Sequence, residues 1–64
     1  MIYPRENPTP LNGGKMQHHL YFDTMADFPN LPKLDRVAAG SDAFCVETGD
    51  ACILRGDTGE WELI

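Results

Sequence analysis

The residues best suited to chemistry in this chain are two cysteines, Cys45 and Cys52, which could form a disulfide or a redox pair. A reactive pair is typically placed in a Cys-x-x-Cys turn or beside a cation, because the thiolate must be stabilised. These two cysteines are separated by six residues in a strand-like stretch, and the nearby Glu47 and Asp50 disfavour a thiolate. We therefore expect both to be free thiols that act as small buried hydrophobic side chains.

His18 and His19 are the second candidate for chemistry, as acid–base groups or as metal ligands. Adjacent histidines cannot easily turn both imidazoles toward one ion, and no Cys/His group has the spacing of a zinc site. No nucleophile is placed to form a triad with either histidine by a recognisable signature. The acidic residues are scattered among turns and strand edges, whereas paired-carboxylate hydrolysis needs a cleft. We expect no catalytic residue, no cofactor and no metal site, and hence no enzymatic activity.

The tripeptide Arg55-Gly56-Asp57 is the one that integrins recognise at hairpin tips. Three-residue matches arise often by chance, and Gly56-Asp57 also has a structural role in a loop. We therefore interpret this tripeptide as part of a turn rather than as an adhesion site.

Length and charge limit the classes of function. A chain of 64 residues makes one domain and hides only about 60% of its unfolded surface on folding. Such small domains usually gain stability from disulfides, metal or association. Because we expect free thiols and no metal site, association is the source of stability that we expect here. The net charge of −5 argues against nucleic acid as a partner. No apolar run is long enough for a membrane span, and the first residues lack a signal-peptide profile, so we expect synthesis in a cytoplasm.

Two segments of the chain differ in composition. Residues 1–20 hold Pro4, Pro8, Pro10, Gly13 and Gly14, and prolines remove backbone donors and fix φ. This difference in composition suggests two parts, an extended N-terminal arm over residues 1–20 and a small β-rich oligomerisation module over residues 21–64. The arm should be ordered only on a partner, and its apolar tip is the expected particle anchor: Met1, Ile2, Tyr3 and Pro4.

The middle of the chain predicts a short strand and one helical turn. The strand covers residues 19–24, and Thr24 with Asp27 forms a capping-box-like start for a turn over residues 25–28. Pro29 should end that turn, because proline removes a helical hydrogen bond. Three apolar residues should then fold down as an irregular lid, namely Leu31, Leu34 and Val37.

The last 24 residues predict a three-stranded antiparallel meander, with strands at residues 43–47, 50–54 and 60–64. Its two turns are near-copies, and each contains a glycine suited to a positive φ, Gly49 and Gly59. A type I turn with a bulged Gly49 would place Phe44, Val46, Cys52 and Leu54 on one face; a two-residue loop would set Cys45 opposite Cys52. Either register leaves apolar residues on both faces, which a monomer of this size would struggle to cover.

The run FDTMADFP at residues 22–29 and the run GSDAFCVETGDACILRGDTGEWELI at residues 40–64 resemble small bacteriophage virion proteins of the head-fibre type. The end of the chain is also similar to the fibritin foldon, in which an Asp-Gly-Glu-Trp hairpin assembles as a trimer. The resemblance covers about residues 21–64, and Cys45 and Cys52 stand near sites where Val and Tyr are usual. It implies a non-enzymatic structural role and trimerisation.

The sequence therefore predicts a mostly β protein that acts by association. We expect a virion structural protein, a head fibre, capsid decoration or cement protein, that forms a homotrimer and attaches to a capsid or other virion protein through its arm. The alternative is a small acidic binding or regulatory module, such as a phage-encoded inhibitor of a host protein. The expected oligomer interface consists of apolar meander residues: Phe44, Val46, Ile53, Leu54, Trp61, Leu63 and Ile64.

Overall fold

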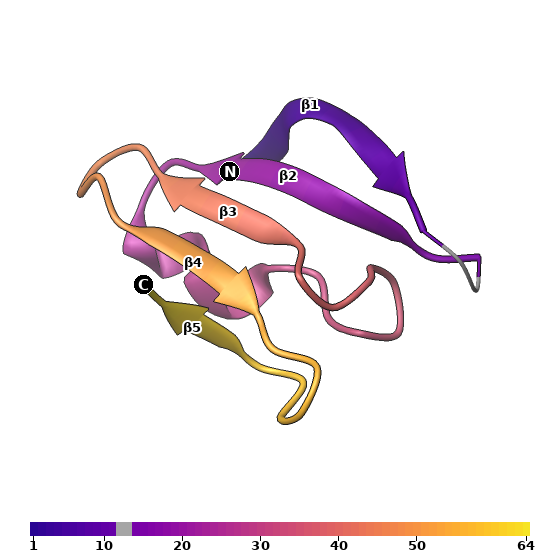
Figure 1. The fold of residues 1–64 in the computed structure, drawn as a ribbon. Coiled ribbons are helices and arrows are strands. Elements are labelled where there is room, and N and C mark those ends of the chain that lie inside the picture. Colours follow the sequence, from indigo (N-terminus) through magenta and orange to yellow (C-terminus); the bar gives the residue numbers. More distant parts are fainter. Residues whose placement is uncertain (12–13) are drawn as a thin grey trace.

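A computed structural model describes residues 1–11 and 14–64 of the chain. The protein is mostly β, as predicted, and its strands form one five-stranded sheet in the order β1-β2-β3-β4-β5 (Figure 1). All neighbouring strands are antiparallel except β2 and β3, which are parallel. The elements are β1 Ile2–Pro10, β2 Met16–Phe22, the 3₁₀ helix η1 Met25–Asn30, β3 Asp42–Cys45, β4 Ala51–Leu54 and β5 Trp61–Leu63.

The parallel pair requires a crossover, because two parallel strands cannot be joined by a tight turn. Residues 23–41 make this connection, and they hold η1 and an irregular stretch behind the sheet in Figure 1. The other face of the sheet, toward the viewer in Figure 1, has no layer of described chain over it. We call the first the covered face and the second the open face.

The expected free arm is wrong, because the sheet spans the chain rather than its C-terminal part alone. β1 pairs with β2 from Ile2 opposite Phe22 to Pro10 opposite Met16, with two register shifts between these ends. Its prolines are tolerated because β1 is an edge strand, where a missing donor can face outward. The expected division at residue 20 falls inside β2, and Gly13 of the expected arm lies outside the described residues.

The core lies between the covered face and the crossover. The expected lid is confirmed, since Leu31 is 2% and Val37 3% exposed, and Leu34 packs against them. The Trp61 indole joins this core, and its Nε1 donates to the carbonyl oxygen of Pro32 at 2.7 Å. The buried hydrophobic cluster consists of Leu20, Phe22, Leu31, Val37, Ala43, Cys45, Cys52, Leu54 and Trp61.

The helical turn begins where the sequence predicts and ends later. Asp27 donates its backbone N–H to the Thr24 carbonyl at 3.0 Å, and its carboxylate faces the Thr24 N–H at 3.5 Å. Pro29 does not stop the helix, which continues to Asn30 and ends with the Leu31 N–H on the Phe28 carbonyl. A 3₁₀ helix this short loses little from one missing donor, since proline's φ suits it.

The two similar turns have the same geometry. Gly49 and Gly59 have φ of 78° and 73°, as their positions predict. Each donates its N–H to the carbonyl four residues earlier, on Cys45 at 2.9 Å and on Arg55 at 3.0 Å. A second hydrogen bond joins the two strand ends at each turn. The Cys45 N–H donates to the Asp50 carbonyl, and the Arg55 N–H donates to the Glu60 carbonyl. Both connections are therefore four-residue loops.

A four-residue loop overturns both expected registers of the β3–β4 hairpin. Ala43 lies opposite Cys52 and Phe44 opposite Ala51, so Cys45 and Cys52 are diagonal neighbours. Diagonal neighbours are commonly 7–8 Å apart between Cα atoms, which is too far for an unstrained disulfide. Both thiols are fully buried on the covered face, as predicted for small hydrophobic residues. Burial raises the pKa of the Cys52 thiol to about 11.

Candidate association surface

The open face carries a row of three aromatic side chains, continued by an alanine, across the sheet. Tyr3 pairs with Tyr21 in β1–β2, Tyr21 with Phe44 in β2–β3, and Phe44 with Ala51 in β3–β4. Side chains that are paired in this way share one face of a sheet. All four are half-buried although no described element covers them, because they cover one another. The strands thus present one continuous apolar row.

One pair of aromatic rings in this row is tilted and the other packs edge to face. The Tyr3 and Tyr21 centroids are 5.7 Å apart at 47°, and those of Tyr21 and Phe44 are 6.1 Å apart at 78°. The Arg5 guanidinium lies 5.8 Å from the centre of the Tyr21 ring. Rings at such angles form an irregular apolar surface of the kind that protein interfaces bury.

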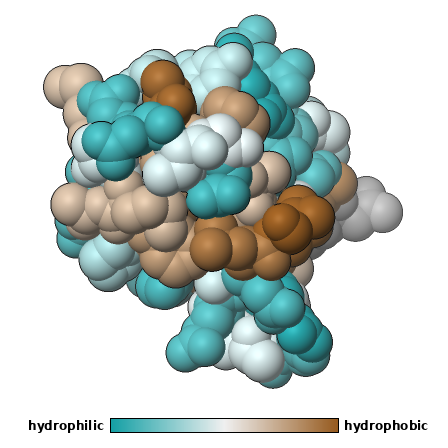
Figure 2. All heavy atoms as spheres, turned by 90° about the vertical axis from the view of Figure 1, so that its left-hand side faces the viewer, coloured by the Kyte–Doolittle hydropathy of each residue, from teal (hydrophilic) through white to brown (hydrophobic). Residues whose placement is uncertain are grey.

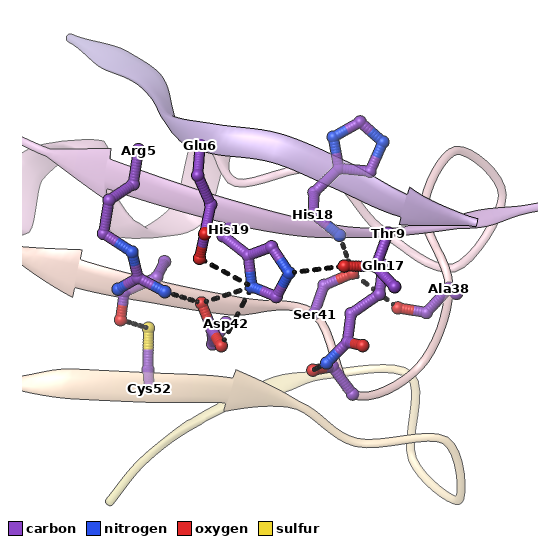
Figure 3. A network of polar contacts seen from close by, with 12 residues as sticks. Arg5, Glu6, Thr9, Gln17, His18, His19, Ala38, Ser41, Asp42 and Cys52 are labelled. Carbon is purple, nitrogen blue, oxygen red and sulfur yellow. Dashed lines mark hydrogen bonds and ion pairs between the residues drawn. The ribbon is translucent and has the colours of Figure 1, made fainter. Parts of the chain in front are cut away.

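A polar row lies beside the aromatic row and joins three strands (Figure 3). The Asp42 carboxylate accepts from Arg5 Nη2 at 2.5 Å and lies 3.2 Å from His19 Nδ1. The other ring nitrogen of His19 is 3.1 Å from the Thr9 hydroxyl, and Glu6 is 4.0 Å from Nδ1. The His19 side chain is 14% exposed. The charges of this row are therefore paired within the subunit.

Thr9, His19 and Asp42 have the order of a nucleophile, a base and an orienting carboxylate. Acyl transfer also needs donors for an oxyanion and a cleft that holds a substrate. Thr9 is exposed on the edge strand. A hollow of about 610 Å³ lies beside β1, but it is lined by residues 4–8, His18 and Leu20 and not by Thr9. We assign the network a structural role, as a clamp between β1, β2 and β3. Among residues 1–11 and 14–64, no group of three potential ligands is arranged to hold a metal.

This clamp was missed by sequence reasoning, which assigned His18 and His19 no role. The available signal was alternation, because His19 and Tyr21 share a strand face while His18 shares the opposite face with Leu20. The pairing partner Asp42 could not be found without the parallel register of β2 and β3. In Figure 3 the His18 ring points away from the network.

The expected interface residues divide into three groups. Leu54 and Trp61 are 1% and 6% exposed and belong to the core of their own subunit. Phe44 and Ile53 lie on the open face, and Ile53 is 38% exposed. The remaining three are exposed at one end of the sheet, namely Val46, Leu63 and Ile64.

That end of the sheet also holds the expected anchor. Figure 2 views it directly and shows apolar brown and tan surface bordered by hydrophilic teal. Met1 is 77% exposed, whereas Ile2 packs against the core and Tyr3 lies on the open face. The Met1 amino group pairs with Asp27, and this contact holds the pKa of the Asp27 carboxyl below its usual range. The four residues expected as an anchor thus face different ways.

The tripeptide at residues 55–57 closes on itself. Arg55 Nε donates to Asp57 Oδ1 at 2.9 Å, and Arg55 Nη2 donates to Asp57 Oδ2 at 2.6 Å. A third donor of Arg55 binds Glu62 at 2.8 Å. The guanidinium is thereby paired with carboxylates of the same hairpin.

One further structural fact concerns membranes: within the described ranges, no helix is long and apolar enough to cross a bilayer. Comparison of the chain with protein-family models, with curated proteins and with solved structures found no match.

Proposed function

We propose that this protein is a non-catalytic structural module that associates with copies of itself through its open face. The observation that carries this proposal is the aromatic row of Tyr3, Tyr21 and Phe44 on a sheet face that no described element covers, while the opposite face is closed by the crossover. Sheets bury such faces by packing against a second layer, and here a second subunit supplies that layer.

The polar row suits burial in such an interface. An unpaired charge at an interface is costly, because it loses its water without gaining a partner. Asp42 already has Arg5 and His19 as partners, so an incoming subunit need not supply any. Tyrosine, phenylalanine and arginine are also the residue types enriched in interface centres.

The setting that we propose for this association is a bacteriophage virion, where the protein acts as a head fibre, decoration or cement protein after synthesis in the host cytoplasm. The support is the resemblance of residues 22–29 and 40–64 to small virion proteins, which also implies a homotrimer. Within the segment Met1 to Pro4, the attachment to the particle uses the exposed Met1 and Pro4, since Ile2 and Tyr3 are engaged within the subunit.

A second candidate is an acidic module that binds and inhibits a basic protein. It is favoured by the net charge of −5 and by the exposed carboxylates of the two hairpin turns, Glu47, Asp50 and Glu60. Such an inhibitor would act as a monomer, and the oligomeric state therefore separates the two candidates.

Sedimentation equilibrium of the purified protein tests self-association. We expect an oligomer for the native chain, a monomer for Ile53→Glu, and an oligomer for the matched control Met16→Glu. Ile53 is 38% and Met16 45% exposed, but Met16 lies outside the open face. A native chain that stays monomeric at high concentration contradicts the proposal and favours the inhibitor. Mass spectrometry of purified particles then tests the virion setting by asking whether the chain is present and in how many copies.

A further inference from the structure

We propose that the outer edge of β5 binds an extended segment of a different protein, which adds to the sheet as a sixth strand and carries alternating apolar and basic residues. This site goes beyond the proposed self-association, because it uses the edge of the sheet rather than the open face. Three features support this site: the two edges of the sheet differ, β5 presents free backbone groups, and β5 is acidic.

The two edge strands are unequal in their protection. β1 contains Pro4, Pro8 and Pro10 and has two register shifts, and both features prevent another strand from pairing with it. β5 contains no proline or lysine, and it pairs with β4 in an unbroken register over three residues. Exposed edges normally carry such protection, because their free backbone groups attract other strands. β5 is protected only by its short length and by its glutamates, and no proline blocks its backbone groups, so a strand of complementary charge can still pair with it.

The backbone groups that β5 presents can be assigned from the ladder. The Arg55 N–H binds the Glu60 carbonyl at 3.0 Å, and the Ile64 N–H binds the Ala51 carbonyl at 2.8 Å. Antiparallel pairs alternate between bonded and non-bonded, so Glu62 is bonded to β4 between these two. Trp61 and Leu63 therefore direct their N–H and C=O groups outward. Within residues 1–11 and 14–64 no strand lies beyond β5, which is the last in the sheet.

A second copy of this chain is a poor occupant. If two β5 strands pair so that Trp61 and Leu63 both use their outward groups, Glu62 lies directly opposite its copy. If the two strands instead pair symmetrically about Trp61, so that Trp61 lies opposite its copy, Glu62 lies opposite Glu60 of the copy. Like charges directly opposite each other destabilise a sheet pair. The β1 edge of a copy is closed by its prolines, so a strand of another protein, with basic residues opposite the two glutamates, is the better-matched occupant.

The side chains of β5 define what this occupant carries. Glu60 and Glu62 are exposed and share one side of the strand, where basic side chains would be attracted. Arg55 neutralises part of the Glu62 charge, and Glu60 provides the rest. On the other side, Trp61 is 6% and Leu63 47% exposed, and an apolar residue beside Leu63 would extend the core. The matching segment alternates apolar and basic residues.

Capped seven-residue peptides test this site on the full-length, ¹⁵N-labelled protein. The probe alternates valine and lysine, one control alternates valine and glutamate, and a second control has the probe's composition with the valines and lysines in separate blocks. We expect the probe to bind about tenfold or more tightly than either control, since two cross-strand charge pairs are involved. The amide signals of Trp61 and Leu63 should shift most. Equal binding of the block control would mean charge attraction alone, and shifts centred on β1 or the open face would overturn the site.

Two variants sharpen the test. Leu63→Pro removes an outward donor without a bond to β4 and should abolish binding, whereas Leu63→Ala keeps the donor and should retain it. Glu60→Lys with Glu62→Lys should reverse the preference toward the glutamate peptide, and this holds even if Leu63→Pro fails to fold. Unchanged preference in the charge-reversed protein would overturn the proposal. Tyr3→Ala, which removes one end of the aromatic row at the opposite edge of the sheet, should bind the probe as the native chain does, so the two proposals can fail separately.

Discussion

His19 and Asp42 lie directly opposite each other in the parallel pair of β2 and β3, with Nδ1 and Oδ2 3.2 Å apart. Arg5 reaches the same carboxylate from β1 at 2.5 Å. One aspartate thus joins the first hairpin to the strand that follows the crossover. These contacts hold β1, β2 and β3 side by side. They therefore also hold the aromatic row in place, because that row runs through the same three strands.

This relationship predicts different effects for the two adjacent histidines. His19→Ala should lower the free energy of unfolding by about 1 kcal/mol, the size expected for a partly exposed charged hydrogen bond. His18→Ala should change it by about 0.5 kcal/mol or less, because that ring lies outside the network. Urea unfolding followed by tryptophan fluorescence measures both. Equal effects of the two substitutions would show that the clamp contributes nothing to stability.

The local features of this fold could be predicted from the sequence, and the long-range ones could not. The repeated Thr-Gly pairs locate both turns, since the glycine at positions 49 and 59 takes a positive φ. The apolar lid and the start of the helical turn follow from similarly short patterns. The hairpin register was wrong because it depends on loop length, and nothing in the sequence distinguishes a four-residue loop from a shorter one.

The N-terminal strand was missed because its composition argues against one. Prolines at positions 4, 8 and 10 exclude a central strand, but they are compatible with an edge strand. Ile2 and Tyr3 could have indicated which way the strand faces, since one packs on the core and the other on the open face. The open-face clamp was missed for the same reason, because it exists only once β1, β2 and β3 are placed side by side.

Deletion of residues 1–10 is predicted to unfold the protein, or to leave it without a cooperative urea transition. The deletion removes the longest strand, exposes the edge of β2 and takes Ile2 away from the core. A small domain has little stability to lose. Circular dichroism and a ¹H–¹⁵N spectrum measure the outcome. A truncated chain with a dispersed spectrum and a sharp transition would instead support the dispensable arm that the sequence suggests.

The buried Cys52 thiol predicts a loss of stability in alkali. Its pKa is raised to about 11 by burial, from a value of 9.0 for the exposed group. The unfolded chain therefore loses this proton first, and the free energy of unfolding should fall as pH rises from about 9 to about 11. Below pH 9 both states keep the proton and no change is expected from this group. Urea midpoints for the native chain and for Cys52→Ala isolate the effect, because other groups titrate in both proteins. Parallel curves would mean that Cys52 does not titrate differently on unfolding.

Substitutions of Trp61 should separate folding from association. Trp61→Ala removes a buried aromatic group at a cost of about 3–5 kcal/mol and should unfold a domain of this size. Trp61→Phe keeps most of the packing but leaves the Pro32 carbonyl without its donor, and it should cost about 1–3 kcal/mol.

The folded Trp61→Phe protein should then associate as the native chain does, because this side chain lies in the core of its own subunit and not on the open face. Sedimentation equilibrium beside Ile53→Glu makes the comparison at equal subunit concentration. If Trp61→Phe were folded but monomeric, the tryptophan would be part of the interface after all. Assembly would then involve the covered face, and the open face would no longer account for it.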